Sequence, residues 1–352
     1  MYKLLLYGIL TSSSFLLCGI FKTLQAQDFK NAGEYMDYIS AEFTKISKDT
    51  WNYTSAASHG KKARKVDNLR KELITTVSDA IKKIEKMPKY DEDGSLRDSM
   101  VSYLKLNYNV LKQDYAKIVD MEEISEQSYD LMEAYLKAQE IADTKLEIAG
   151  DMVESQQKVF SDKHNITLIY SEDKISKKLK EAHYVYDYYN IIYLIFFRSY
   201  KQEAYLLVAL NKNDLNGIEQ NNNALFTFSK DGLLKMDTLK TFKGDLSLKN
   251  AAYQILKFYN NEAEVKIPIL TDFLLKKENF EKTKKIFDSK PASKRTNQEI
   301  EDFNIAVNDY NQEVNKYNIT NQDLNKERNK QLDNWNKTVA DFLDKHVPKK
   351  YS

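Results

Sequence analysis

The chain matches itself when it is shifted by 152 residues, and this internal match is the strongest constraint on its fold. Residues 66–90 fall on residues 218–242 without a gap, and the helix breaks at His59-Gly60 and Asn211-Lys212 also coincide. Helical periodicity alone would align apolar positions but would not align the breaks, so the match predicts an internal duplication. Four pairs illustrate it: Val66 and Ile218, Leu73 and Leu225, Asp79 and Asp231, Ile84 and Met236.

Each half predicts helices and no sheet. Only nine glycines and four prolines occur among 352 residues, and apolar residues recur at intervals of three and four. We expect an all-α fold of two tandem four-helix units related by internal duplication, with a long C-terminal helix. The predicted domains are a signal peptide (1–26), a first helical unit (27–167) and a second (168–352). The predicted helices are 29–58, 61–87, 95–119, 123–164, 174–210, 214–240, 246–287 and 296–346, and Pro268 should kink or restart its helix.

The last predicted helix carries a seam typical of coiled coils. Its apolar residues are spaced by three and four positions: Ile300, Phe303, Val307, Tyr310, Val314 and Tyr317. The segment 318–331 is polar, so the sequence leaves open whether the helix is continuous through it.

The N-terminus reads as a signal peptide. A basic start at Lys3 precedes the apolar run 4–21, and Leu24-Gln25-Ala26 predicts cleavage after Ala26. The only cysteine, Cys18, follows Leu16-Leu17 rather than a small residue, which disfavours a lipid anchor, although soluble and anchored forms both remain open. The chain is therefore expected to be exported to the periplasm, outer envelope or cell surface.

Charge argues against a nucleic-acid partner. The chain has 53 basic and 52 acidic residues, a net charge of +1, and the signal peptide holds two of the lysines and no acid. A mature chain of net charge about −1 with interspersed signs offers no global field to attract polyanions.

The segment 183–200 is rich in tyrosine and carries no charge from Tyr188 to Phe197. An uncharged run of this length is half of what a membrane span needs, and Arg198, Lys201 and Glu203 close it, so we expect no transmembrane helix in the mature chain. The helical spacing predicts a buried core helix with Tyr189, Tyr193 and Phe197 inside. A second apolar face would hold Tyr184, Tyr188, Ile192 and Ile195. The alternative is a wall that binds a small apolar or aromatic ligand through Tyr186, Tyr189, Tyr193 and Tyr200.

Several helix-face patterns resemble a known family. The segments are 33–39 (GEYMDYI), 57–66 (ASHGKKARKV), 128–149, 163–166 (KHNI) and 218–225 (IEQNNNAL). Together they resemble an uncharacterised family of exported, often lipid-anchored, surface proteins of spirochaetes and Bacteroidetes. The resemblance implies an envelope or surface location, and it brings no activity or functional residues.

No catalytic or metal-binding signature stands out. The four histidines, His59, His164, His183 and His346, are scattered, and neither a Glu-x-x-His pair nor a His-Glu-x-x-His motif occurs. The loop Asp91-Glu92-Asp93-Gly94 misses the calcium-loop spacing and suits an acidic turn before a helix. The patch 61–65 (KKARK) has no interleaved aromatics and suits a solvated helix start better than a nucleic-acid contact. We expect no cofactor, no metal and no enzymatic activity.

These observations favour a non-enzymatic interaction or scaffolding role with an unknown protein or envelope partner. A small-ligand binding module is the alternative. An enzyme that uses carboxylate pairs brought together by the fold is a third possibility.

Overall fold

The fold is all-α, as predicted. The computed structural model describes residues 29–59, 61–114, 125–168 and 174–349, and the predicted signal peptide lies outside these ranges. The contacts divide the chain into two compact units: unit 1 comprises residues up to Asn190 together with 339–352, and unit 2 comprises Ile191–Thr338. The sequence predicts a single boundary between the units, after residue 167. In the structure, helices α6 (Lys174–Asn211) and α10 (Asn297–His346) each contribute residues to both units.

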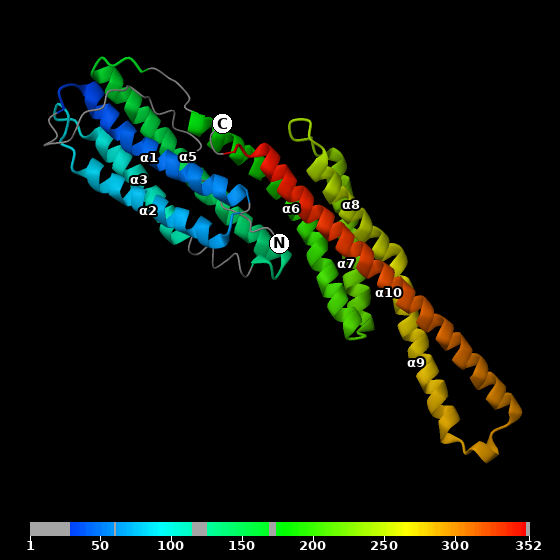
Figure 1. The fold of residues 1–352 in the computed structure, drawn as a ribbon. Helices are drawn as coiled ribbons and strands as arrows, with labels where there is room; N and C mark the ends of the chain where they lie inside the picture. The colour runs from blue at the N-terminus through cyan, green and yellow to red at the C-terminus, as the bar shows by residue number, and fades with distance from the viewer. Residues whose placement is uncertain (1–28, 60, 115–124, 169–173, 350–352) are drawn as a thin grey trace. The chain divides into compact units, whose positions relative to one another are not determined.

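Unit 1 is a bundle in which successive helices pack side by side. It contains α1 (Ala32–Ser58), α2 (Ala63–Glu85), α3 (Ser95–Asn109) and α5 (Tyr129–Lys163), with α1 on α2, α2 on α3 and α3 on α5 (Figure 1). A five-residue π-helical turn, Val110–Asp114, follows α3 directly. At one end of the core, the fully buried ring of Tyr35 stacks on Phe160 at 5.5 Å.

Unit 2 repeats part of this arrangement. Helices α7 (Leu215–Thr238) and α8 (Ser247–Asn261) pack against each other, and a second π-helical turn, Glu262–Lys266, leads into α9 (Ile267–Ser289). Pro268 sits in the first turn of α9, directly after the π-turn, so the predicted helix restart is found there. Proline has no N–H to donate, and the nearby Ala263 carbonyl accepts a hydrogen bond from the Asn222 amide instead.

The two halves share element boundaries at the offset of the sequence match. Shifting α3 by 152 residues gives the bounds of α8, and the same shift carries the first π-turn onto the second. The bridge between Tyr90 and Asp93 likewise has its counterpart between Phe242 and Asp245.

Matching positions also make matching contacts. The Asp93 carboxylate accepts a hydrogen bond from the Ser95 N–H at 2.9 Å, and Asp245 accepts one from Ser247 at 2.8 Å. A cation caps the end of the preceding helix in both halves: Arg97 donates to the Met87 carbonyl and Lys249 to the Leu239 carbonyl, each at 2.8 Å. Leu73 and Leu225 are both fully buried.

The match is weaker in the first helix of each half. Ile39 is 1% exposed but its counterpart Ile191 is 49% exposed, and Tyr53 is 5% exposed against 41% for Tyr205. The equivalence therefore rests on the helices and turns from α2 to the first π-turn and from α7 to the second.

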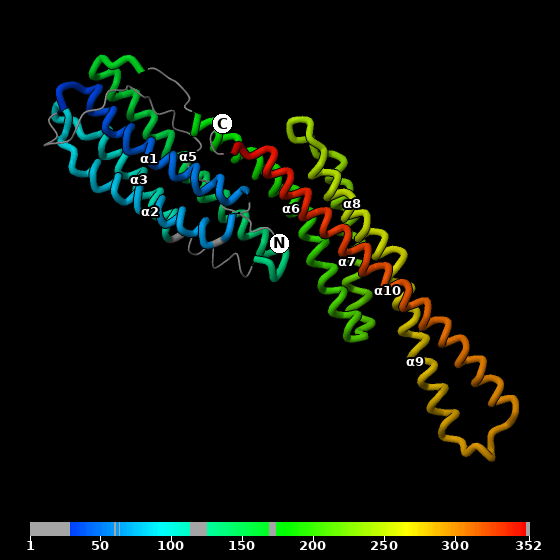
Figure 2. Tube along the Cα trace, in the orientation of Figure 1, coloured from blue at the N-terminus to red at the C-terminus, as the bar shows by residue number. Residues whose placement is uncertain are grey.

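A hairpin of α9 and α10 extends unit 2. Its two helices run antiparallel (Figure 2). They face each other through aromatic rings spaced seven residues apart on each helix, which form a ladder. The pairs are Phe273 with Tyr317 at 4.5 Å, Phe280 with Tyr310 at 4.4 Å, and Phe287 with Phe303 at 4.0 Å. Thr296 and Glu299 form a capping box at the start of α10.

Most predicted helices are present, and α10 is continuous through the polar segment 318–331. At 1.5 Å per residue its length is about 75 Å. The predicted helix 246–287 is wrong in one respect, because the second π-turn interrupts it. The predicted helix 123–164 starts later, at Tyr129, where the Ser128 hydroxyl accepts from the Leu131 N–H. The predicted residues 115–119 and 123–124 lie outside the described ranges.

Candidate functional site

The Tyr-rich helix lies in the core. Tyr189 and Tyr193 are 4% and 3% exposed and Phe197 is fully buried, so their predicted burial is confirmed. Tyr193 stacks on Phe197 with 5.5 Å between ring centroids. Tyr186 is also buried, and Tyr200 is half-buried. None of these side chains lines either cavity described below, so the packing favours the core interpretation over the ligand wall.

The second predicted apolar face of that helix is only partly buried. Ile192 is fully buried, but Tyr184 is 50% exposed. The prediction fails at Tyr184 because a tyrosine can keep its hydroxyl end in water while its ring covers the helix.

The histidines and the acidic loop are placed as ordinary structural residues. His59 contacts the Asp344 carboxylate at 3.0 Å, and His183 contacts Asp187 at 3.2 Å. His164 packs on Phe160 at 4.5 Å, and His346 packs on Phe342 at 4.6 Å. Lys163 donates to Asp93 at 2.8 Å, and this hydrogen bond is the main reason that the pKa of Asp93 falls well below its usual range.

A buried charge cluster, Glu203, Glu262 and Arg328, is the chemically most distinctive feature of unit 2. The side chain of Arg328, from α10, donates to Glu203 of α6 and, at 2.6 Å, to Glu262 at the start of the second π-turn. Arg328 is 8% exposed, Glu203 2% and Glu262 0%. Ions removed from water in this way are expensive unless they are paired, so the cluster ties three helical segments to one register.

Glu262 holds a proton in this environment. Burial is the main cause that raises its pKa to about 9, and the neighbouring Glu203 raises it further against the opposing effect of Arg328. A protonated Glu262 can donate from Oε2, the oxygen that has no donor among the described residues, and a hydrogen bond with Glu203 contributes to the shift. Burial also raises the pKa of Tyr259, whose hydroxyl lies in the same core.

The fold does not need this cluster to form a π-turn. In unit 1 the equivalent positions hold Asn107 for Tyr259 and Val110 for Glu262, and both are buried. The first π-turn forms at Val110 without a carboxylate. The charges are therefore particular to unit 2, and π-turns that interrupt α-helices are frequent at functional sites.

A groove between α7 and α9 lies beside this π-turn. Its volume is about 440 Å³, and its apolar surface comes from Leu215, Ile218, Ile267, Pro268 and Leu275. Asn222 joins it to the π-turn, because its amide donates to the Ala263 carbonyl at 3.0 Å. The polar side chains of the groove are Asn216, Glu219, Asn222, Asn223, Thr271 and Asp272.

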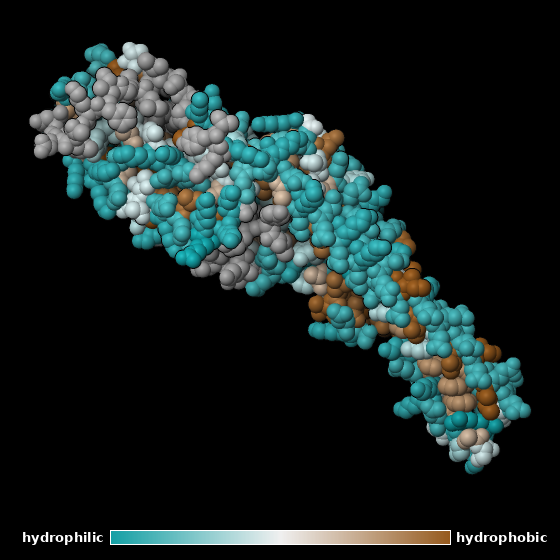
Figure 3. All heavy atoms as spheres, viewed as in Figure 1, coloured by the Kyte–Doolittle hydropathy of each residue, from teal (hydrophilic) through white to brown (hydrophobic). Residues whose placement is uncertain are grey.

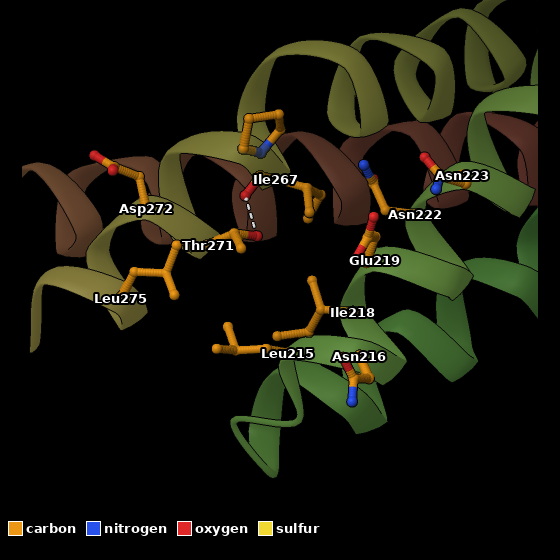
Figure 4. Close-up of a pocket in the computed structure, with 11 residues that line it drawn as sticks. Leu215, Asn216, Ile218, Glu219, Asn222, Asn223, Ile267, Thr271, Asp272 and Leu275 are labelled. Carbon is orange, nitrogen blue, oxygen red and sulfur yellow. Dashed lines mark hydrogen bonds between the residues drawn. The ribbon is translucent and has the colours of Figure 1, made fainter. Parts of the chain in front are cut away.

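Figure 4 shows how these groups are distributed. Leu215 and Ile218 lie on the α7 side of the groove and Leu275 lies on the α9 side, with Asp272 towards one end and Glu219 and Asn222 towards the other. The Thr271 hydroxyl is occupied, because it donates to the Ile267 carbonyl at 3.0 Å. The Asn222 Oδ1 is buried and has no donor among the described residues.

The groove has asparagines at the aligned positions where α2 of unit 1 has cations. On α2, Asp67 is paired with Arg70 at 3.0 Å and with Lys71 at 2.7 Å. On α7, Glu219 takes the place of Asp67, and the equivalents of Arg64, Arg70 and Lys71 are Asn216, Asn222 and Asn223. None of the eleven residues that line the groove is a lysine, arginine or histidine. No described residue forms an ion pair with Glu219.

This arrangement has a clear chemical preference. Asp272 is already paired with Lys276 at 2.8 Å, so the carboxylate of Glu219 is the charge that the groove leaves without an ion pair among the described residues. An apolar channel with this carboxylate suits a cationic group carried on an apolar stem. The sequence did not predict the groove. Glu219 and Asn222 lie within the aligned range 218–242, and nothing in the pattern shows that they share a cavity. The replacement of three cations by three asparagines in the aligned halves was the available signal.

A second cavity, of about 370 Å³, lies in unit 1. Its lining includes His59, Lys61, Lys65, Asp344 and Lys349. Asp344 is already paired there with His59 and, at 2.6 Å, with Lys349. Lys61 and Lys65 of the predicted basic patch therefore line a cavity whose carboxylate, Asp344, is already paired with other residues.

The surface of unit 2 shows further unburied apolar groups. In Figure 3 hydrophobic side chains follow the hairpin of α9 and α10, where the exposed apolar residues include Leu275, Ile286, Ile300 and Ile305.

Across the described ranges, no helix combines the length and apolar character of a membrane span. No grouping of His, Cys, Asp and Glu suited to a metal ion occurs in that part of the chain either. Comparisons with protein-family models, curated proteins and solved structures gave no match.

Proposed function

We propose that this chain is an exported protein of the envelope or cell surface that acts by binding, without catalysis. In this proposal the groove between α7 and α9 of unit 2 binds a basic segment of a partner protein. The observation that carries the proposal is that the groove contains the carboxylate of Glu219 and no cationic side chain. Glu219 is a carboxylate like its unit 1 counterpart Asp67. Asp67 is paired with two cations on α2, whereas asparagines stand at the corresponding positions near Glu219.

The partner would supply the missing charge. A lysine or arginine side chain can lay its methylene stem along Leu215, Ile218 and Leu275 and place its charged head near Glu219. The carbonyl oxygen of the Asn222 side chain offers it a further acceptor. The partner is then a protein segment that alternates apolar and basic residues.

Two wider parts of the proposal rest on the sequence. The N-terminal signal pattern supports export, and the family resemblance supports an envelope or surface location, soluble or lipid-anchored. The shared boundaries and contacts of the two halves support an origin by duplication. After it, only unit 2 acquired the buried charge cluster and the three asparagines of α7 that line the groove.

Binding can be tested with a defined probe. The probe is a short, non-helical peptide of leucine and lysine, which cannot cover the face of a long helix, with a twin in which glutamate replaces each lysine, titrated by calorimetry. We expect the lysine peptide to bind at least tenfold more tightly. Asn223→Lys should abolish this preference, because it restores a cation one turn from Glu219 as in unit 1.

The matched control is Gln220→Lys, which adds the same charge to the exposed side of α7 outside the groove. It should leave the affinity within about twofold of the unmodified protein. Equal binding of the two peptides, or equal effects of the two variants, would overturn the proposed binding mode.

Export has its own test. Mass spectrometry of the protein from its native cell should show an N-terminus near Gln27 or Asp28, or a lipid-modified Cys18 if the chain is anchored. An intact Met1 on the mature protein would contradict export.

A further inference from the structure

Helix α5 in unit 1 is apolar on two opposite sides. Its inner side packs in the core through residues such as Leu146, Val153 and Phe160, each 3% exposed or less. Its outer side carries four large apolar residues that are about half exposed: Ile141 at 47%, Ile148 at 57%, Met152 at 63% and Val159 at 54%.

These four residues form one line, here called the outer stripe. Their spacing is seven, four and seven residues, which at 3.6 residues per turn keeps all four within a narrow sector of the helix. The stripe is about 27 Å long, from 18 residues at 1.5 Å each. Single exposed apolar residues are common, but a continuous line at coiled-coil spacing is the pattern that a second helix covers.

One border of the outer stripe is acidic. Glu140, Glu147, Asp151 and Glu154 follow it on the same side at spacings of seven, four and three, together with Lys137 and Lys158, so this border keeps a net negative charge. Lys137 is paired with Glu140 at 2.7 Å. The field of the acidic border reaches the neighbouring Asp143, whose pKa rises to about 8 chiefly because of burial and further because of Asp187, Glu140 and Glu147. The other border is small and mostly uncharged, with Ala138, Ala149 and Gln156 beside Lys145.

The charges decide between possible occupants. In an antiparallel pair of α5 helices centred on Gly150, the apolar residues would match, but each acidic border would face itself, with Glu147 opposite Glu154 of the second copy. A parallel pair would face the acids with the alanine border, which supplies only Lys145. Anionic lipid is disfavoured because surface-binding helices carry lysine and arginine beside their apolar face.

We propose that the outer stripe of α5 is a docking site for an amphipathic helix of a partner protein whose apolar face is bordered by lysine and arginine. The partner helix has about five turns and lies along the stripe, with its basic border over Glu147 and Glu154. This surface is separate from the unit 2 groove and shares no residue with it. The apolar line supplies the contact area, and the acidic border selects the partner and its orientation.

The test uses two synthetic 20-residue helices with the same isoleucine and leucine face, one bordered by lysine and one by glutamate. Binding to the full-length mature protein is measured by calorimetry. We expect the lysine-bordered helix to bind at least tenfold more tightly than its twin. Ile148→Lys and Met152→Lys should each weaken its binding at least tenfold, because they place a charge in the stripe opposite apolar side chains.

Two controls separate this site from the groove and from non-specific adhesion. Leu234→Lys changes a residue of α7 that is 59% exposed outside the stripe, and it should leave binding unchanged. Asn223→Lys should also leave it unchanged, since that variant alters only the groove. If Asn223→Lys abolishes binding of the long helix while Ile148→Lys does not, the stripe is not the docking site.

The other occupants have distinct signatures. Light scattering should show no self-association that Ile148→Lys reverses, and vesicles of anionic lipid should not retain the protein. Stripe-dependent dimerisation or vesicle binding, or equal affinity for the two helices, would overturn the proposal.

Discussion

Tyr193 tests the core interpretation at a single position. Its ring is 3% exposed and stacks on Phe197, so removing it should leave a cavity between α6 and its neighbours in unit 2. We expect Tyr193→Ala to lower the free energy of unfolding by about 3 kcal/mol. Tyr184→Ala, at a position 50% exposed on the same helix, should change it by less than about 1 kcal/mol. Equal melting temperatures for the two variants would favour the ligand-wall interpretation.

Glu262 makes the stability of unit 2 depend on pH. Its pKa is raised from 4.5 to about 9, so between these values the folded chain holds a proton that the unfolded chain releases. The stabilisation is complete below about pH 4.5 and is lost as the pH rises through 9, by up to about 1.4 kcal/mol per pH unit.

Glu262→Gln removes this titration and should flatten that fall in denaturant melts from pH 5 to 9. Glu264→Gln, an exposed position in the same π-turn, should keep the slope of the unmodified protein. An unchanged slope in Glu262→Gln would show that another group binds the proton.

At the scale of elements, periodicity predicted the helices well because the apolar spacing is regular and the breaks contain turn residues. It did not predict the π-turns. A π-turn adds only one residue to one turn of a helix. The apolar residues Ala263 and Ile267 on either side of it are still four positions apart, which is also the spacing in an ordinary α-helix, so the sequence pattern does not reveal the π-turn. Glu203 was also misread, as a charge that closes an apolar run, because its buried partner Arg328 lies 125 residues away.

The α9–α10 hairpin depends on its aromatic ladder. The ring of Phe280 lies 4.4 Å from that of Tyr310 with 7° between their planes, and both are only half-buried. We expect Phe280→Ala to speed amide hydrogen exchange in residues 276–314 at least tenfold and to leave α7 and α8 protected. Phe226→Ala, on α7, is the control. Uniform loss of protection throughout unit 2 would show that the hairpin is not an independent folding element.

At the scale of the whole molecule, the sequence predicted two similar halves, and their element boundaries coincide from α2 and α7 through the two π-turns. It could not predict the functional asymmetry between them. That asymmetry depends on which side of α7 faces α9, and only the fold shows that Asn216, Asn222 and Asn223 line one groove with Glu219. The outer stripe of α5 was likewise hidden, because an apolar helical residue reads as core until its exposure is known.

The most direct measurement of the central claim is site-specific photo-crosslinking in the native cell. A photoreactive side chain at Asn216, in the groove, should yield a discrete adduct with one protein, and Asn223→Lys should abolish that adduct. The same side chain at Leu234, exposed on α7 outside the groove, should yield none. Identical adducts from both positions, or an Asn216 adduct that persists in Asn223→Lys, would contradict binding of a basic partner segment in the groove.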